Sequence, residues 1–342
     1  MTDSTSPGRR TAPTLEAVAV AAGVSKSTVS RVINGSNQVS PDAATAVEAA
    51  IERLNYVPNR AARSLVNSKT MAIALVVPED MTRFFGDPYF AAIVQGIARG
   101  LEASDYVLTL QLASPSRPSR KTVRYLTGGN VDGAFVISHH SGDHFLTELG
   151  TTLPVVFGGR PLSAGTGSRY FVDVDNAAAA AMGTQHLIDL GRRNIAILAG
   201  PVDMPAGVDR TAGWRAALEA AGMPATRVAH GDFSHASGAE AMRELLDAHP
   251  DLDAVFVASD LMAMGALTVL RHRGITVPED VAVVGFDDSP AAVAGAIQLT
   301  TVHQPSQEMG REMAAMMLDL LSGVPVEPAR ILPTHLVVRD SA

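Results

Sequence analysis

The sequence contains no cysteine, which excludes disulfide bonds, thiolate metal sites and cysteine nucleophiles. It has no run of about eighteen consecutive apolar residues, the length that a membrane-spanning helix needs. Residues 1–13 are polar and small, and no apolar stretch among them resembles a secretion signal. These absences argue against membrane insertion and export, so we expect a cytoplasmic protein.

The sequence motifs of common enzymes are also missing. There is no GxGxxG, no GxxxxGKS/T and no GxSxG, so neither a phosphate loop nor a nucleophile elbow is predicted. His139, His140, Asp143 and His144 are residue types that bind metals, but adjacent histidines point in different directions, and we favour a surface loop. We therefore expect no catalytic residues, no metal and no cofactor.

The charge is distributed unevenly along the 342 residues. A net charge of −8 alone argues against DNA binding, because phosphates repel an acidic surface. Residues 1–69, however, hold eight Lys and Arg against five Asp and Glu, a balance of +3 that leaves −11 for the remainder. A basic segment joined to an acidic one is typical of a DNA-contacting domain attached to a sensor.

Local signals predict two short helices joined by a tight turn near the N-terminus. Thr14 can cap a helix over 15–22, and Gly23 supplies the left-handed backbone position of a sharp turn. Ser25 then caps a second helix that extends to Ile33, an order that indicates a helix-turn-helix motif. The polar side chains on the outer surface of the second helix are Lys26, Ser27, Ser30 and Arg31.

A third helix is predicted to begin with Ser40 as its cap and Pro41 at its first position. Its apolar stripe consists of Val47, Ala50, Ile51 and Leu54. Taken alone, the three helices are equally consistent with a small bundle whose exposed basic side chains are simply solvated.

Longer motifs favour DNA binding. Residues 14–19 (TLEAVA), 22–25 (AGVS), 28–34 (TVSRVIN) and 54–65 (LNYVPNRAARSL) resemble the N-terminal signature of the lactose-repressor (LacI) family. The resemblance implies that Lys26, Ser27 and Arg31 contact base edges in the major groove. It implies phosphate contacts, which set the register on the duplex, for Thr14, Ser25, Thr28, Ser30, Asn34 and Tyr56.

The residues after the third helix are expected to become helical only on DNA. Asn59 can cap a new helix after Pro58, but a helix over 60–66 is too short to be stable alone in water. The resemblance implies that this hinge pairs with its dimer mate and inserts Leu65 into the minor groove, where an apolar wedge unstacks bases. Packing of Leu65 against the sensor is the alternative. The expected minor-groove residues are Asn59, Arg60, Ala62 and Leu65.

The rest of the chain alternates short apolar runs with amphipathic stretches. This alternation predicts parallel sheets built from strand–helix–strand units, which bind ligands beyond the carboxyl ends of their strands. The predicted strands span 72–77, 107–112, 133–137, 154–157, 195–198, 254–258 and 281–285. Polar residues follow several of them, among them Ser138-His139 and Asp287-Asp288. We therefore predict an α/β sensor whose two halves meet across a cleft.

The family resemblance continues through segments 87–90, 131–133, 159–161, 209–214, 258–265, 284–288 and 299–305. It implies a two-lobed sensor with parallel sheets, shaped like periplasmic sugar-binding proteins. The implied organisation is a disordered tail (1–13), an all-α helix-turn-helix domain (14–58), a hinge helix and linker (59–69) and the sensor (70–342). The N-terminal lobe would take about 70–171 and 303–329, and the C-terminal lobe about 172–302 and 330–342.

The same resemblance places a small-molecule effector between the lobes. Arg210 and Asp287 would bind it, because a guanidinium and a carboxylate can donate to and accept from adjacent sugar hydroxyls. A purely structural ion pair between them is the alternative. The expected effector-binding residues are Arg210, Asp287, Ser259, Arg160, Gln304, Phe84, Phe85, Tyr89, Ser138 and His139, with the aromatic rings covering the apolar face of a sugar.

Other residues near the expected site have structural interpretations. Asp175 and Asp260 are predicted to cap helices and Trp214 to lie in the core. Met204 occupies the position at which purine-responsive relatives carry an arginine, which disfavours a purine. Ser259 replaces an asparagine that many relatives carry, so the expected effector is a sugar or sugar derivative whose identity stays open.

These expectations describe a bacterial, nucleoid-associated transcriptional regulator, most simply a repressor, controlled by a carbohydrate. One helix-turn-helix reads half a site, so we expect a homodimer on palindromic double-stranded DNA. The sequence ends without a heptad tail, and a tail-dependent tetramer is not expected. The sequence does not distinguish an inducer from a co-repressor. The rival interpretation, a secreted sugar-binding protein, is opposed by the missing export signal and by the N-terminal helices.

Overall fold

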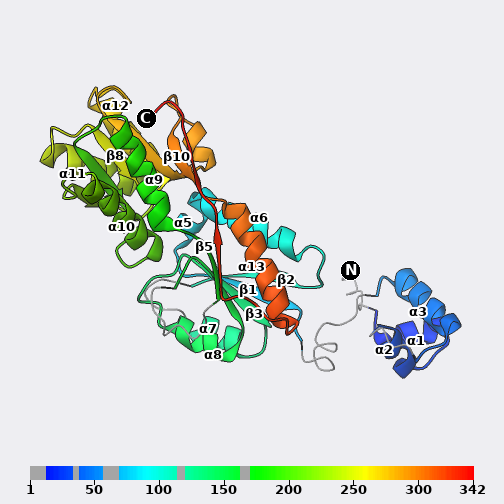
Figure 1. Cartoon of the computed structure of the whole chain (residues 1–342). Coiled ribbons are helices and arrows are strands. Elements are labelled where there is room, and N and C mark those ends of the chain that lie inside the picture. The colour runs from blue at the N-terminus through cyan, green and yellow to red at the C-terminus, as the bar shows by residue number, and fades with distance from the viewer. Residues whose placement is uncertain (1–12, 34–37, 57–68, 114–119, 162–169) are drawn as a thin grey trace, which may run out of the picture. The chain divides into compact units, whose positions relative to one another are not determined.

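The computed structural model describes residues 13–33, 38–56, 69–113, 120–161 and 170–342. By its internal contacts the chain divides into two units, Met1–Thr70 and Met71–Ala342, which are described separately and can be followed by colour in Figure 1. Within the described residues, no helix combines the length and the apolar character required to cross a membrane.

The first unit contains α1 (Leu15–Ala22), α2 (Lys26–Ile33) and α3 (Pro41–Leu54). The side chain of Thr14 accepts a hydrogen bond from the Ala17 amide and caps α1, which ends at Gly23 with φ 67°. Ser40 caps α3 in the same way, as its sequence position predicts. The core shared by the three helices consists of Val18, Ala19, Val29, Val47, Ala50 and Tyr56.

The N-terminal lobe of the second unit is built on a parallel sheet. Among the described residues it has six strands in the order β11-β5-β4-β3-β1-β2. These are β1 (Ala72–Val77), β2 (Val107–Leu112), β3 (Gly133–Ile137), β4 (Val155–Gly158), β5 (Tyr170–Val174) and β11 (Ala329–Leu332). The helices of this lobe are α5 (Met81–Gly86), α6 (Pro88–Leu101), α7 (Arg120–Thr127), α8 (Phe145–Thr152) and α13 (Ser306–Leu321).

The C-terminal lobe repeats this architecture with a second sheet, whose six described strands are ordered β12-β10-β9-β8-β6-β7. They are β6 (Ile195–Ala199), β7 (Val228–His230), β8 (Ala254–Val257), β9 (Ala282–Asp287), β10 (Thr300–His303) and the antiparallel β12 (His335–Val337). Its helices are α9 (Asn176–Asp189), α10 (Pro205–Ala220), α11 (His235–Ala248), α12 (Asp260–His272) and the short η1 (Pro290–Val293). The predicted pair of mainly parallel α/β halves is confirmed.

The chain passes between the lobes at three places in the described sequence: after β5, after β10 and after β11. The red C-terminal stretch in Figure 1 follows the last of these passages. Two passages lie slightly later than the sequence suggested, after Val174 and Leu332 and not near 171 and 329. The reason is strand pairing, since Val174 is still in register with Leu332 in the first sheet, and an apolar run does not reveal its partner strand.

Helices α6 and α13 pack closely against each other and lie side by side in Figure 1. Two glycines allow this approach. A β-carbon added at Gly96 would lie 2.0 Å from the Gln307 carbonyl oxygen, and one at Gly310 would lie 2.3 Å from the Ile93 carbonyl oxygen. Neither contact is possible for a larger residue without displacing backbone, so these helices are held at a fixed short separation.

Candidate functional site

A cavity of about 80 Å³ lies between the two lobes of the sensor, large enough for several water molecules or part of a ligand. Residues at or just beyond the carboxyl ends of strands from both sheets line it, as parallel α/β sheets require. Ser138 and His139 follow β3, Asp173 lies in β5, and Asp287 ends β9. The other wall residues are Arg83, Asp87, Tyr89, Gly158, Gly159, Asn176, Met204, Pro205, Ala206, Arg210, Phe233, Ser259, Gln304 and Met309.

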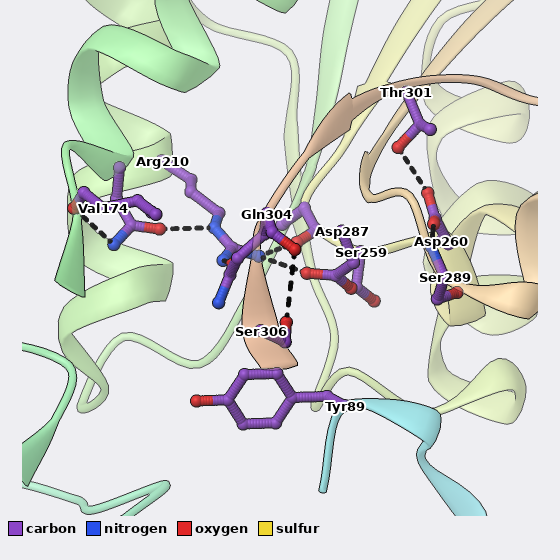
Figure 2. Close-up of polar contacts among 12 residues, drawn as sticks. Tyr89, Val174, Arg210, Ser259, Asp260, Asp287, Ser289, Thr301, Gln304 and Ser306 are labelled. Carbon is purple, nitrogen blue, oxygen red and sulfur yellow. Dashed lines mark hydrogen bonds and ion pairs between the residues drawn. The ribbon is translucent and has the colours of Figure 1, made fainter. Parts of the chain in front are cut away.

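Arg210, on α10, is the residue on which the polar wall converges (Figure 2). Its Nε donates to Asn176 Oδ1 at 2.9 Å, and its Nη2 donates to Gln304 Oε1 at 2.7 Å. Its Nη1 donates to the Ala258 carbonyl at 2.6 Å and lies 3.5 Å from Asp287 Oδ1. The guanidinium is thus fixed by three elements of the fold, and its orientation is set before any ligand arrives.

Burial dominates the electrostatics around Arg210. It lowers the pKa of the guanidinium and raises that of Asp287, an effect that the charge of Arg210 opposes. The guanidinium carbon also lies 3.5 Å from the centre of the Phe286 ring, a cation–π contact. Asp287 and Asp288 both have positive φ values, 110° and 54°, in a region that non-glycine residues avoid. Backbone strain of this kind is concentrated at binding sites, where the surrounding structure supports it.

Ser259, not Asp260, caps α12. The Ser259 side chain accepts a hydrogen bond from the Met262 amide, whereas Asp260 is the first residue of the helix. The Asp260 carboxylate instead accepts from Thr301 Oγ1 at 2.6 Å and from the Ser289 amide at 2.7 Å, as Figure 2 shows. The expectation that Asp260 caps its helix is therefore wrong, because the preceding serine holds the cap position. Burial raises the pKa of Asp260 to about 7.

The two other structural interpretations are confirmed. Asp175 Oδ1 accepts a hydrogen bond from the Ala178 amide at 2.9 Å and caps α9. Trp214 is completely buried in the sensor core.

His139 lines the cavity with both of its ring nitrogens buried. Its side chain is 4% exposed, and neither ring nitrogen has a hydrogen-bond partner in the part of the chain that the structure describes. Burial lowers its pKa to about 4, so the imidazole is neutral near pH 7. A neutral imidazole supplies one donor and one acceptor, a combination suited to sugar hydroxyls.

Direct polar contacts join the lobes beside the cavity. His140, which follows β3, lies with Nδ1 2.9 Å from Asp203 Oδ2 in the opposite lobe and Nε2 3.4 Å from Glu79 Oε1 in its own. The Ser141 amide donates to the Asp203 carbonyl at 2.9 Å. The largest influence on His140 is its hydrogen bond to Glu79, and together these carboxylates raise its pKa to about 9. We call His140, Ser141 and Asp203 the histidine strap.

Two arginines of the N-terminal lobe make further interlobe contacts. Arg160 Nε and Nη2 donate to the two carboxylate oxygens of Asp209 on α10 at 2.7 and 2.6 Å. Arg83 donates to the Asp232 carbonyl, and its guanidinium carbon lies 5.3 Å from the centre of the Phe233 ring. The described sensor therefore has its lobes held together by charge-assisted bonds at the cavity edge.

The residues expected at the effector site divide into two groups. The structure brings Arg210, Asp287, Ser259, Gln304, Tyr89, Ser138 and His139 to the cavity wall. It does not bring Arg160, Phe84 or Phe85 there. Arg160 is engaged by Asp209, Phe84 is buried against Phe90, and Phe85 is 71% exposed. Among the described residues, no group of three or more His, Asp or Glu side chains could hold a metal ion.

In the first unit, α2 presents the polar surface that the sequence predicts. Lys26, Ser27 and Arg31 are exposed, whereas Val29 is completely buried. Ser25 Oγ accepts a hydrogen bond from the Thr28 amide at 3.1 Å, which orders the start of the helix. Tyr56 packs in the core and is 7% exposed. Asn34 and the hinge residues Asn59, Arg60, Ala62 and Leu65 lie outside the described residues.

Comparison with known proteins accounts for both units. Residues 14–59 match the model of bacterial regulatory proteins of the lacI family, and residues 184–342 match that of the periplasmic binding protein-like domain. The HTH-type transcriptional regulator CelR of Thermobifida fusca is 49% identical over 339 residues, which cover 97% of this chain and 99% of that protein. The chain belongs to the lacI family of bacterial regulatory proteins.

Other members of the lacI family match over similar lengths. The ribose operon repressor of Escherichia coli (strain K12) is 31% identical and is aligned over 96% of this chain and 99% of its own. The structure of a CelR–cellobiose complex is 47% identical, with a TM-score of 0.75 and coverage of 96% and 100%. That of the lac repressor dimer bound to operator and the anti-inducer ONPF is 28% identical, with a TM-score of 0.83 and coverage of 96% and 98%. This lacI-family chain is a DNA-binding transcriptional regulator and not an enzyme.

Several wall residues of the lacI-family sensor were missed at the sequence level. Asp87 caps α6 by accepting from the Tyr89 amide, and Asn176 begins α9, so both have sequence positions of ordinary structural residues. Phe233 lies in a loop between β7 and α11 with φ 67°, and no local pattern marks it. These residues come together at one cavity only in the tertiary structure, where the two lobes face each other.

Proposed function

We propose that this regulator represses transcription as a homodimer bound to a near-palindromic operator, and that cellobiose bound between its lobes releases it from DNA. The observation that carries this proposal is the cavity between the lobes, where three polar side chains meet. Arg210 and Asp287 belong to the C-terminal lobe, and Gln304 lies in the connection between β10 and α13. The similarity to CelR, whose solved complex contains cellobiose, supports the choice of sugar.

The cavity wall has the mixture of groups that a sugar requires. Asp287 can accept from hydroxyl groups, and His139 can both donate and accept, so adjacent hydroxyls find complementary partners. Phe233, Tyr89 and Met309 provide apolar surface for the C–H faces of a pyranose ring. Because Arg210 is held by protein acceptors in the described state, it contributes a fixed positive charge with little reorganisation on binding.

The DNA-contacting half of the proposal rests on α2. We infer that Lys26, Ser27 and Arg31 reach base edges in the major groove, and that Thr14, Ser25, Thr28, Ser30, Asn34 and Tyr56 contact phosphates. The exposed positions of the first three side chains support this assignment. For the hinge we infer that Asn59, Arg60, Ala62 and Leu65 act at the minor groove, with Leu65 as the wedge.

We infer homodimerisation from the symmetry of the proposed target. A single helix-turn-helix covers half a site, and two copies related by a twofold axis cover a palindrome. The lac repressor to which this chain is similar was solved as a dimer on its operator, which supports the same arrangement on cytoplasmic DNA here.

The decisive experiment measures operator affinity with and without sugar. The full-length protein is first used to enrich a binding site from a pool of random duplexes, and fluorescence anisotropy then gives Kd at physiological ionic strength. We expect the enriched palindrome to bind at least about 10³-fold more tightly than a scrambled duplex. Saturating cellobiose should weaken operator binding by at least about tenfold. Absence of any preferred palindrome would overturn the DNA-binding assignment, and equal affinity with and without cellobiose would overturn the induction mechanism.

A pair of conservative variants on α10 tests the sensor independently of DNA. Arg210→Lys keeps the positive charge but removes the planar fork, so the response to cellobiose should be lost while operator affinity remains. Arg215→Lys is the matched control, because Arg215 lies on the same helix but is exposed. A normal cellobiose response in Arg210→Lys would contradict the assigned role of the guanidinium.

A further inference from the structure

The cavity wall contains more carboxyl groups than guanidinium groups. Three carboxylates line it, those of Asp87, Asp173 and Asp287, against the two guanidiniums of Arg83 and Arg210. His139 adds no charge near neutral pH, since burial lowers its pKa to about 4. Carboxyl groups therefore outnumber guanidinium groups in the described wall.

Both guanidiniums already have protein partners, although Arg83 Nε makes no hydrogen bond within the described residues. Arg83 Nε lies 3.2 Å from Glu79 Oε1, a buried carboxylate just behind the wall, and Arg83 also donates to the Asp232 carbonyl. Arg210 is paired with Asp287 and donates to three protein acceptors. A phosphate or carboxylate entering the cavity would have to compete with these partners for either arginine.

Asp87 and Asp173 are the two wall carboxylates that form no ion pair within the described residues. Asp87 Oδ1 accepts from the Tyr89 amide at 3.0 Å, and no Lys, Arg or His nitrogen of the described chain lies within ion-pair distance of either carboxylate. Asp173 is 4% exposed and accepts from the amides of Val174 and Arg160 and from Asn176 Nδ2. Burial raises the pKa of both carboxyls, an effect that the charge of Arg210 opposes at each of them and that of Arg83 also opposes at Asp87.

We propose that this pocket admits sugars without negative charge and rejects phosphorylated or carboxylated ones, and that Asp87 is the residue that enforces the selection. This inference rests on the proposed sugar-sensing function and narrows its ligand class. An anion beside Asp87 and Asp173 meets like charges in a poorly solvated space, where repulsion is stronger than in water. A neutral sugar can donate hydroxyl hydrogens to the same oxygens, so the feature that excludes the anion assists the neutral ligand.

Asp87 can be tested cleanly because asparagine caps helices as well as aspartate does. Asp87→Asn removes the charge with little change in size and keeps the cap of α6. Asp80→Asn is the matched control, since Asp80 caps α5 by accepting from the Arg83 amide but is exposed and does not line the cavity. The two variants change net charge equally and differ in proximity to the ligand.

Isothermal titration of the full-length protein would compare cellobiose with its 6′-phosphate and glucose with glucose 6-phosphate. We expect the wild type to prefer the neutral member of a bound pair by at least about 100-fold, and Asp87→Asn to reduce that ratio by about tenfold, with Asp80→Asn unchanged. Binding of a phosphorylated sugar as tightly as its neutral partner would overturn the selection. An unchanged ratio in Asp87→Asn would overturn the role of Asp87. Failure of both neutral sugars to bind would instead remove the proposed function, and this inference with it.

Discussion

Raising the pH is expected to weaken effector binding, because it deprotonates His140, which joins the two lobes. Contact with Glu79 and Asp203 raises the pKa of His140 from 6.5 to about 9. The sign follows directly: the Asp203 contact of the closed sensor helps to raise this pKa, so its stabilisation is present while His140 is protonated and is lost as the pH rises through about 9. An effector that binds the closed sensor should therefore lose affinity over the upper part of this range.

The magnitude is smaller than the whole pKa shift suggests. Glu79, the first cause of the shift, belongs to the same lobe as His140 and stays beside it when the lobes separate. Only the Asp203 contact is broken by opening, and the Asp203 side chain is 46% exposed. Ion pairs of that exposure contribute about 1 kcal/mol at most, which corresponds to about a fivefold change in Kd.

The assay is a titration of cellobiose by calorimetry between pH 8 and 10. Asp260, with a pKa of about 7, is ionised throughout this window, and burial raises the pKa of Tyr89 well above its ordinary value. We expect the wild type to lose about fivefold in affinity, and His140→Gln to bind weakly with no pH dependence. His144→Gln is the control, because exposed His144 lies in the same loop and makes no side-chain capping bond. If the cellobiose affinity of His140→Gln depended on pH as that of the wild type does, the assigned role of the histidine strap would be refuted.

Three further predictions concern other parts of the structure. Gly96→Ala should destabilise the sensor by about 1–3 kcal/mol, because the added carbon collides with the Gln307 carbonyl. The loss is measured as a lower midpoint of urea unfolding, and an unchanged midpoint would mean that α6 and α13 are not in tight contact. Arg31→Ala should cost about 1–3 kcal/mol of specific operator binding without altering cellobiose affinity, and an equal loss on scrambled DNA would instead indicate a phosphate contact. A double-mutant cycle on Arg160 and Asp209 should give a coupling of about 1 kcal/mol in cellobiose affinity, whereas additive single effects would remove this pair from lobe closure.

Elements whose signals are local can be located from the sequence. Thr14 and Ser40 were identified as caps because capping depends on residues three positions apart. The strands at 72–77, 107–112 and 133–137 are predicted to the residue, since the first and third are continuous apolar runs and the second alternates leucine with Thr109 and Gln111. Strands β7 (Val228–His230) and β12 (His335–Val337) are short and only partly buried, and they gave no such signal.

The candidate site was predicted less completely than the fold. Residues at strand ends, such as Ser259 and Asp287, were anticipated because parallel sheets gather strand ends at one edge. Arg160 also follows a strand, but its side chain is captured by Asp209, a residue of another lobe that no local pattern connects to it. Asp87 was overlooked for the opposite reason: its capping role is sufficient to explain it locally, and its second role depends on a cavity that only the tertiary structure forms.

The three passages between the lobes determine how the sensor can move. Each is short: one residue separates β5 from α9, two separate β10 from α13, and two separate β11 from β12. Pro305 and Pro333 occupy two of these connections, and proline fixes one of its two backbone torsions. A joint with so few free torsions permits a narrow arc of rotation and little shear. A small change in the angle between the lobes at the ligand therefore rotates each lobe as a rigid body and is not absorbed by local deformation.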